Sequence, residues 1–208
     1  MKILICDDHK LVRDGLRQIL QKLAKVTLID EARDGSGALI ILKREVFDIV
    51  LLDISLPDIS GLEVLQAIKA LCPSINVLML SMHPQEQYAL RALKLGASGY
   101  LTKDTASEEL LLAVKKISAG EKYISQSLAE SIAVNLDENT IKQKHEMLSG
   151  REFEIMIRLA NGKPLQGIGD ELQISVKTVS TYRRRIMEKM EFIKNSDITK
   201  YCMGKSLV

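Results

Sequence analysis

Five side chains that could together carry phosphoryl chemistry follow short apolar segments of the chain: Asp7, Asp8, Asp53, Ser81 and Lys103. Carboxylates brought close together repel one another unless a cation intervenes, and a hard divalent ion such as Mg2+ suits carboxylates, water and phosphate. A carboxylate beside a metal ion and an ammonium group can attack a phosphoryl group and become an aspartyl phosphate. Lys103 and the ion would then neutralise the phosphoryl oxygens, and Ser81 could donate a hydrogen bond to one of them. Singly, strand-end carboxylates are mostly turn residues and a lysine is mostly solvated, so the prediction rests on the ordered set.

A second group of polar residues lies at helical spacing near the C-terminus. Lys177, Ser180, Thr181 and Arg184 recur at i, i+3, i+4 and i+7, which places them on one face of a helix. The run Arg183–Arg185 adds cations that could meet phosphates. With a short preceding helix and a tight turn, this pattern is typical of a helix-turn-helix, whose second helix lies in the major groove of DNA. The alternative is an ordinary amphipathic surface helix, which periodicity alone slightly favours.

The first 120 residues contain the elements that would position the five phosphoryl-chemistry residues. Short β-branched or leucine-rich runs alternate with amphipathic stretches, a pattern that predicts a doubly wound α/β fold with five parallel strands and helices on both faces. The predicted strands are Lys2–Cys6, Val26–Ala32, Ile49–Leu52, Asn76–Ser81 and Gly99–Leu101. The predicted helices are Leu11–Gln21, Gly37–Glu45, Leu62–Leu71, Gln85–Leu95 and Ser107–Ser118. Ligands of such sheets bind at the carboxyl ends of the strands, where all five residues would stand.

The rest of the chain predicts a small all-α domain. We expect an α/β domain over residues 1–120, a linker helix and loop over 121–146, and a small all-α domain over 147–208. The linker comprises a helix at Gln126–Leu136 and a polar segment, Asp137–Met147. A capping box of Ser149 and Glu152 starts the next helix, which stops at Gly162. The segments that follow are Leu165–Leu172, Val176–Met190 and Ser196–Cys202.

The N-terminal part resembles the receiver domain of two-component response regulators. The resemblance rests on Asp7-Asp8, Asp53-Ile54-Ser55-Leu56-Pro57, Gly61, Ser81, Gly96-Ala97 and Gly99-Tyr100-Leu101-Thr102-Lys103. It implies a flavodoxin-like fold, with Asp53 as phosphoacceptor and Ser81 and Lys103 as ligands of the phosphoryl group. It further implies an Mg2+ site formed by Asp7, Asp8, Asp53 and the backbone carbonyl of Ser55, and a switch aromatic at Tyr100. By residue type alone, Tyr100 would be a half-buried tyrosine on an edge strand.

Two positions depart from the receiver pattern. Asp104 follows Lys103, where most receiver domains have proline, and this puts a cis peptide bond there in doubt. Ser55 stands where methionine is common, and a small polar residue there would alter how water reaches the phosphate.

The C-terminal part resembles the LuxR-type helix-turn-helix. The resemblance rests on Leu148-Ser149, Arg151-Glu152, Ala160-Asn161-Gly162, Ile168, Leu172, Ile174-Ser175, Lys177-Thr178-Val179 and Lys189-Met190. It implies that Ser180, Thr181 and Arg184 face bases. It also implies that Lys177, Thr178, Tyr182 and Arg183 lie near phosphates, and that Glu152 ties the first helix to the recognition helix. Gly169 can be explained by close helix packing, but Gly167 has no evident reason, and each costs ~1 kcal/mol relative to alanine.

Composition and charge agree with this organisation. The net charge is +2, of which residues 149–208 carry +4 and residues 1–148 carry −2, so the DNA-binding candidate is the basic part. The three cysteines are far apart, no apolar run reaches the ~20 residues of a membrane span, and acids follow the N-terminus closely. We therefore expect a cytoplasmic protein without a membrane partner.

Enzyme classes fit the sequence less well. Phosphatases of the haloacid dehalogenase type need an acid at the position of Ser55, and the glycines before Lys103 have the wrong spacing for a Walker loop. The three histidines, His9, His83 and His145, lack the paired spacing of a zinc site.

The two resemblances together identify the chain as similar to response regulators of the NarL/FixJ family. The function they imply is a phosphorylation-dependent transcriptional regulator, with a sensor histidine kinase, promoter DNA and a second copy of the chain as partners. The alternative is an orphan regulator with the same fold that is controlled without phosphorylation. In Ser196–Cys202 the residues Ile198, Tyr201 and Cys202 form a narrow apolar stripe, which could be a dimer contact or could pack within its own domain.

Overall fold

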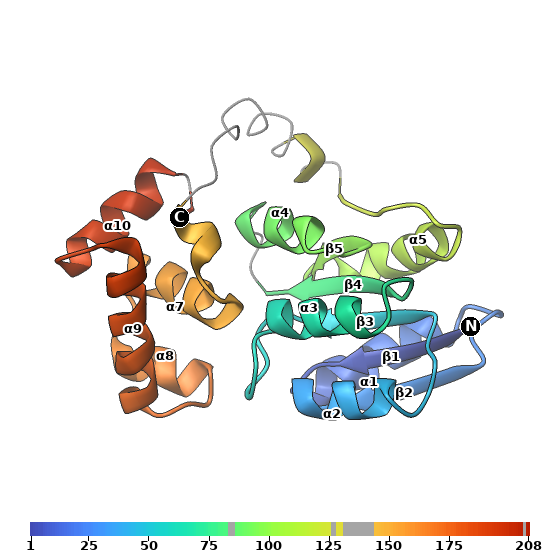
Figure 1. Ribbon diagram of the computed structural model, residues 1–208. Coiled ribbons are helices and arrows are strands. Elements are labelled where there is room, and N and C mark those ends of the chain that lie inside the picture. The colour runs from blue at the N-terminus through green and yellow to red at the C-terminus, as the bar shows by residue number, and fades with distance from the viewer. Residues whose placement is uncertain (83–85, 126–127, 131–143, 206) are drawn as a thin grey trace. The chain divides into compact units, whose positions relative to one another are not determined.

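The computed structural model describes residues 1–82, 86–125, 128–130, 144–205 and 207–208 (Figure 1). The chain divides into two compact units, Met1–Val134 and Asn135–Val208. Within the described ranges, no helix is long and apolar enough to cross a membrane.

The N-terminal unit contains a five-stranded, all-parallel sheet in the order β2-β1-β3-β4-β5. The strands are β1 (Lys2–Cys6), β2 (Leu28–Ala32), β3 (Ile49–Asp53), β4 (Asn76–Ser81) and β5 (Gly99–Thr102). The predicted fold is therefore confirmed. The second strand begins two residues later than predicted, because the amide of Val26 is hydrogen-bonded to the carbonyl of Leu23 in a turn.

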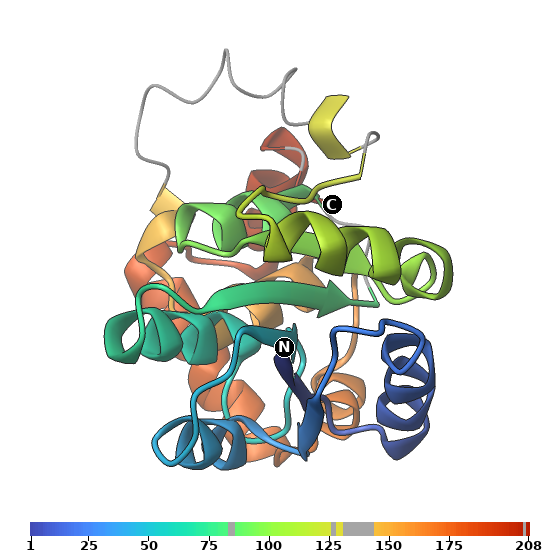
Figure 2. The ribbon, with the colours of Figure 1, turned by 90° about the vertical axis from the view of Figure 1, so that its right-hand side faces the viewer.

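Helices cover both faces of this sheet (Figure 2). They are α1 (Lys10–Leu20), α2 (Gly35–Leu42), α3 (Gly61–Leu71), α4 (Glu86–Lys94) and α5 (Ala106–Ser118). Leu16 and Leu20 of α1 join Leu110 and Val114 of α5 in a single buried cluster on one face, and α2 and α3 pack on the other. Because β3 is covered on both faces, all five of its residues are buried, which explains its continuous apolar sequence.

The register of the strands brings distant residues to one edge. Cys6 pairs with Leu52, so the residues that follow them, Asp7 and Asp53, stand next to each other at the carboxyl edge. The chain order reverses at this point, since β1 lies between β2 and β3. This is the place where parallel α/β sheets bind ligands.

Over its described residues, the C-terminal unit contains a 3-10 helix, η1 (Lys144–Met147), and four α-helices. The α-helices are α7 (Gly150–Ala160), α8 (Leu165–Glu171), α9 (Val176–Met190) and α10 (Asn195–Gly204). The Ser149–Glu152 capping box is confirmed, and α9 has the predicted bounds. Gly162 ends the helix with a φ of 76°, in the left-handed region that favours glycine.

Two predicted segments in the middle of the chain lie partly outside the described residues. The predicted helix Gln126–Leu136 is described at residues 128–130, which are helical, and otherwise lies outside the described residues. The predicted polar linker Asp137–Met147 is described only from Lys144 onward. There, residues 144–147 form η1, which packs against α9.

Helix α10 decides between the two interpretations of its apolar stripe. Ile198 and Cys202 are buried and α10 packs on α7, while the hydroxyl of Tyr201 lies 3.0 Å from Nδ1 of His145. The structure thus favours packing within the domain over a dimer contact for these residues.

Candidate functional site: an acidic pocket and a basic helix

The centre of the acidic pocket is an ammonium group held between two carboxylates. Nζ of Lys103 lies 2.7 Å from Oδ2 of Asp7 and 2.8 Å from Oδ2 of Asp53. The side chains of Asp7 and Asp53 are almost completely buried, and that of Lys103 is 8% exposed. The structure therefore brings together residues that stand 46 and 50 positions apart in the sequence, as predicted from the strand ends.

The backbone after Asp53 is held by two hydrogen bonds and approaches helix α3 closely at Gly61. The amide of Ile54 donates to the carbonyl of Leu80, and the amide of Gly61 donates to the carbonyl of Ile54 at 2.7 Å. A Cβ atom at Gly61 would lie 2.0 Å from the carbonyl oxygen of Asp53, so only glycine allows helix α3 to begin this close to the pocket.

Asp58 fastens the same loop to a second helix. Its two carboxylate oxygens accept hydrogen bonds from the backbone amides of Gly35 and Ser36 at 2.9 and 2.8 Å, in the first turn of α2. These amides have no partners within the helix, and the positive end of the helix dipole favours a carboxylate there. These hydrogen bonds, together with one from the Ser36 side chain, outweigh the effect of burial and hold the pKa of Asp58 below its ordinary value.

Burial dominates the electrostatics of Asp53. It raises the pKa of this carboxyl from 3.8 to about 6, against the opposing effect of Lys103 and with a further increase from Asp7. Burial also lowers the pKa of Lys103, but the attraction of Asp53 and Asp7 is stronger and places that pKa above its ordinary value. Lys103 therefore stays charged, and Asp53 is the group whose charge is costly.

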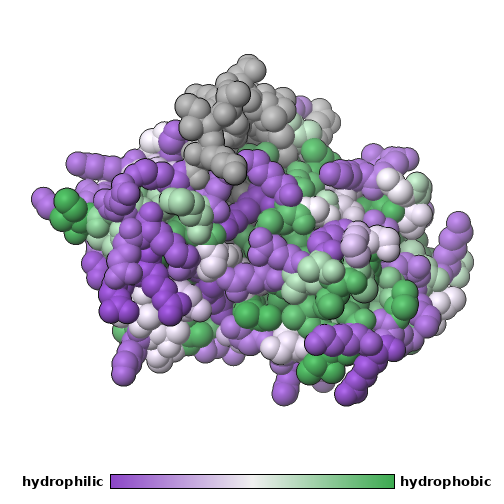
Figure 3. Space-filling view, viewed as in Figure 1, coloured by the Kyte–Doolittle hydropathy of each residue, from purple (hydrophilic) through white to green (hydrophobic). Residues whose placement is uncertain are grey.

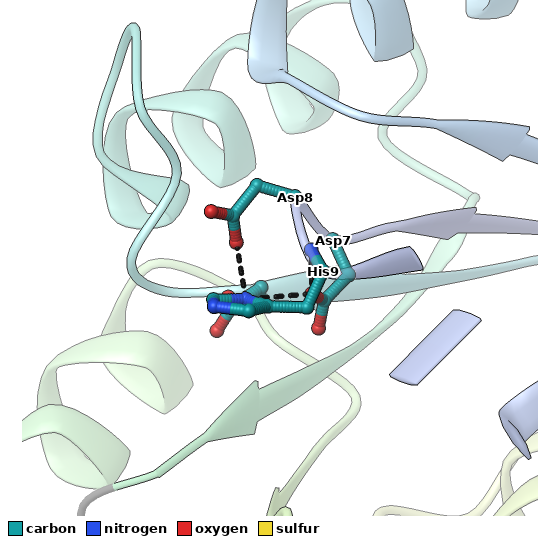
Figure 4. A group of neighbouring side chains, drawn as sticks. Asp7, Asp8 and His9 are labelled. Atoms are coloured by element: carbon teal, nitrogen blue, oxygen red, sulfur yellow. Dashed lines mark hydrogen bonds and ion pairs between the residues drawn. The ribbon is translucent and has the colours of Figure 1, made fainter. Parts of the chain in front are cut away.

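The donor atoms of the pocket suit a divalent cation. One ligand atom from each of Asp7, Asp8, His9 and Asp53 lies within 4.8 Å of all the others. Figure 4 shows Asp7, Asp8 and His9. Carboxylate oxygens are the protein ligands that Mg2+ prefers, so the donor set fits this ion. Ser55 stands beside the set, and its backbone amide donates a hydrogen bond to Asp53. His9 is not among the residues predicted from the sequence to bind the cation.

Ser81 and Tyr100 lie side by side on neighbouring strands. Ser81 is buried, and its carbonyl accepts a hydrogen bond of 2.7 Å from the amide of Lys103. Tyr100 is 3% exposed, which is more buried than a typical edge-strand tyrosine, and its side chain is hydrogen-bonded to that of Ser81. Burial raises the pKa of the Tyr100 hydroxyl, despite the opposing effect of this hydrogen bond. No cis peptide bond occurs in the described part of the chain, which includes Lys103 and Asp104.

Helix α9 carries the residues predicted to bind DNA. Lys177, Ser180 and Arg184 are exposed, while Thr178, Thr181, Tyr182 and Arg183 are partly covered. Hydrophilic residues dominate this part of the surface in Figure 3. Val179 and Ile186 on the opposite side of the helix are completely buried, so the helix has the expected polar and apolar faces.

Several of these side chains already have partners within the domain. Nε of Arg183 donates to Oδ1 of Asn195 in α10 at 2.7 Å, and the hydroxyl of Thr181 donates to the carbonyl of Lys177 at 3.0 Å. Thr178 lies 2.8 Å from the helix-capping hydroxyl of Ser175. These contacts fix the orientation of the polar face, because each joins a side chain to a cap, a backbone group or a neighbouring helix.

An ion pair holds α9 against α7, and a close approach joins α8 to the turn before α9. Nζ of Lys189 lies 2.6 Å from Oε2 of Glu152, which confirms the predicted tie between the first helix and the recognition helix. At Gly169 a Cβ atom would lie 2.8 Å from the carbonyl oxygen of Ile174, so the turn packs too closely for alanine. At Gly167 a Cβ atom would lie 3.6 Å from Pro164, an ordinary contact, and nothing in the structure explains this glycine.

Comparison with known protein families gives one match to each unit. Residues 3–115 match the response regulator receiver domain, and residues 146–202 match the bacterial regulatory proteins of the luxR family. The first match alone covers more than half of the chain.

Two relatives align with this chain over almost its whole length. The response regulator UvrY of Escherichia coli K12 is 30% identical over 96% of this chain and 92% of its own length. The response regulator GacA of Pseudomonas aeruginosa is 32% identical over 100% of this chain and 98% of its own. A crystal structure of a two-component response regulator of the LuxR family from Aurantimonas sp. SI85-9A1 is 33% identical. It covers 64% of this chain and 96% of its own, with a TM-score of 0.61.

These relatives are regulators and not enzymes, in agreement with the sequence analysis. The chain therefore belongs to the two-component response regulators of the NarL/FixJ family, with a receiver domain followed by a LuxR-type DNA-binding domain.

Proposed function

We propose that this response regulator is phosphorylated on Asp53 by a sensor histidine kinase, with Mg2+ bound in the pocket, and that phosphorylation promotes dimerisation and promoter binding. The observation that carries the proposal is the Lys103 ammonium group, which lies within 2.8 Å of carboxylates of both Asp7 and Asp53. Such an arrangement suits a reaction in which negative charge is added to Asp53.

In the proposed transfer, a carboxylate oxygen of Asp53 forms a bond to phosphorus while the bond from phosphorus to the kinase histidine breaks. Lys103 would pair with the phosphoryl oxygens, and the hydroxyl of Ser81 would donate a hydrogen bond to one of them. Asp7, Asp8, Asp53 and the backbone carbonyl of Ser55 would hold Mg2+, which supplies positive charge next to the transferred group. Hydrolysis of the acyl phosphate would later return Asp53 to its carboxylate, so that its lifetime sets the duration of the response.

The contact between Ser81 and Tyr100 offers a way to transmit the change. The hydroxyl of Ser81 is hydrogen-bonded to Tyr100 in this structure, and a phosphoryl group on Asp53 would compete for it. Tyr100 would then adopt a second position, in agreement with its proposed role as the switch aromatic. A phosphoryl group can shift this equilibrium only by its different affinity for the two arrangements.

The DNA-binding part of the proposal assigns α9 to the major groove. Ser180, Thr181 and Arg184 would contact bases, and Lys177, Thr178, Tyr182 and Arg183 would lie near phosphates. The net charge of +4 on residues 149–208 supports a polyanionic partner. A single helix-turn-helix offers little contact area, so we propose a homodimer on a pseudo-palindromic promoter, in the cytoplasm.

The first test is phosphorylation in vitro. With Mg2+ and a small phosphodonor such as acetyl phosphate, the chain should gain one acid-stable, base-labile phosphoryl group, measured by intact-protein mass spectrometry. Asp53→Asn should gain none, and chelation of Mg2+ should abolish the reaction. Asp104→Asn is a matched control, because Asp104 is an exposed neighbour of Lys103 outside the pocket. Equal labelling of wild type and Asp53→Asn would refute the assignment.

The second test separates this proposal from an orphan regulator that does not use phosphate. Light scattering and promoter titration on one phosphorylated sample should show a lower dimer dissociation constant together with a higher DNA affinity. An orphan regulator would bind its promoter with the same affinity before and after labelling, and this result would favour that alternative. A labelled chain that stays monomeric both free and on DNA would refute dimerisation as the mechanism.

A further inference from the structure

We propose that His9 is a ligand of the cation site, through its Nδ1 atom, and that it makes the site prefer a first-row transition ion over Mg2+. The inference rests on the proposed cation site in the acidic pocket and extends it from carboxylate ligands to one imidazole.

The position of the imidazole ring is the first support. Nδ1 of His9 lies 2.7 Å from Oδ1 of Asp8 and 3.5 Å from Oδ1 of Asp7 (Figure 4). In an octahedral site with ligands at about 2.1 Å, adjacent ligand atoms are separated by roughly 3.0 Å. The two distances bracket this separation, so the nitrogen occupies a position that one ion could share with both carboxylates.

The second support is that the side chain of His9 does not cap helix α1. His9 is the N-cap of α1, but its side chain makes no capping hydrogen bond. Its backbone amide instead donates to Oδ1 of Asp7 at 2.8 Å, which orients the residue toward the pocket. The ring does not satisfy the helix end and lies instead against the carboxylate of Asp8. Its side chain is 66% exposed, so an ion from solvent can reach it.

The chemistry of the mixed set predicts its selectivity. Mg2+ prefers oxygen ligands, whereas imidazole nitrogen suits the later first-row ions, whose affinity rises from Mn2+ to Cu2+. Carboxylates of Asp8 and Asp53 bind both classes of ion. His9 should consequently add affinity for a transition ion and add little for Mg2+.

The test uses Mg2+ and Ni2+ as probes on the full chain, with binding measured by isothermal titration calorimetry. His9→Asn is the informative variant, because asparagine is a good N-cap and supplies an oxygen but no ring nitrogen. We expect wild type to bind Ni2+ at least ~100-fold more tightly than Mg2+. His9→Asn should weaken Ni2+ binding at least ~10-fold and leave Mg2+ binding within ~2-fold.

Pulsed EPR with substoichiometric Cu2+ gives a readout that a change in folding would not imitate. Wild type should show couplings from an imidazole nitrogen, and His9→Asn should lose them. A control variant with glutamine at the two other histidines, His83 and His145, should keep them. Loss of the couplings in this control instead of in His9→Asn would overturn the proposal.

The outcomes separate this inference from the function on which it rests. If Mg2+ binds wild type and supports labelling of Asp53, but Ni2+ affinity is equal in wild type and His9→Asn, His9 is not a ligand and only the inference fails. If neither ion binds wild type, or if Asp53→Asn does not weaken the binding of either ion, the cation site itself is refuted and the inference fails with it.

Discussion

Replacement of Asp53 by asparagine should stabilise the receiver domain at neutral pH and have little effect in acid. The folded state raises the pKa of Asp53 from 3.8 to about 6, chiefly because the carboxyl is buried. A carboxyl with a raised pKa binds its proton more tightly in the folded state. Its favourable contribution is therefore complete below pH 3.8 and is lost as the pH rises through 6. Relative to acid, the pKa shift lowers the unfolding free energy of wild type by ~3 kcal/mol at pH 7 and by less than ~1 kcal/mol at pH 4.

Native-state hydrogen exchange of the buried β3 amides measures this difference in the full chain, because these amides exchange mainly through unfolding of the receiver domain. The gain in unfolding free energy of Asp53→Asn over wild type should grow by ~2 kcal/mol between pH 4 and pH 7. The ion pair between Lys103 and Asp7 remains in the variant, so the ammonium group keeps a partner. A gain that is independent of pH, or one that shrinks toward pH 7, would refute the argument from burial.

Adding Mg2+ should narrow the difference in stability between wild type and Asp53→Asn at pH 7, because the cation compensates the buried charge of the wild-type pocket. At ten times the dissociation constant, Mg2+ should stabilise wild type by ~1.4 kcal/mol, while Asp53→Asn gains less, as hydrogen exchange at pH 7 would show. In the helix-turn-helix, Gly167→Ala should raise the unfolding free energy by up to ~1 kcal/mol and Gly169→Ala should lower it. Chemical denaturation monitored by circular dichroism measures the unfolding free energies of the two variants. Equal changes in both would contradict the close packing at Gly169. Arg184→Ala should cost ~1–3 kcal/mol of promoter affinity and relax sequence preference, whereas Arg183→Ala should weaken binding to all sequences and lower the salt slope by ~1. Fluorescence anisotropy at several salt concentrations measures both effects, and unchanged affinity in both variants would exclude α9 as the recognition helix.

The sheet and the centre of the pocket could be predicted because they depend on local patterns. Alternation of apolar runs and amphipathic stretches indicates parallel strands, and parallel strands end at one edge. This rule alone places Asp7, Asp53 and Lys103 together. Asp53 is the last residue of its strand, and the other two directly follow theirs. The capping box and the bounds of α9 were likewise predictable, because their signals lie within a few residues of the helix ends.

Other features depend on contacts between distant segments and carry no local signal. Nothing near Asp58 indicates that its carboxylate caps a helix 22 residues earlier, and the orientation of the His9 ring depends on carboxylates whose positions the fold determines. The helix at residues 144–147 also needs a neighbour, because its polar sequence forms a helix only where α9 and α10 supply contacts. The close approach at Gly169 follows from the geometry of the turn and not from the composition of the helix.

The proposed switch depends on the cost of charge at Asp53 and on the hydrogen bond between Ser81 and Tyr100. A carboxylate at Asp53 is costly to bury, and Lys103 offsets only part of that cost, as the raised pKa of Asp53 indicates. Phosphorylation would increase the negative charge at this position, so the pocket must recruit further positive charge and hydrogen-bond donors. Ser81 is the proposed donor that would have to exchange partners, and in this structure its hydroxyl is already hydrogen-bonded to Tyr100. A hydrogen bond exchanged in a buried site is worth about 1 kcal/mol, and a charge-assisted one about twice that. The difference lies within the ~1–3 kcal/mol that couple two sites in typical allosteric proteins, which is enough for a local reaction at Asp53 to bias the arrangement of β4 and β5.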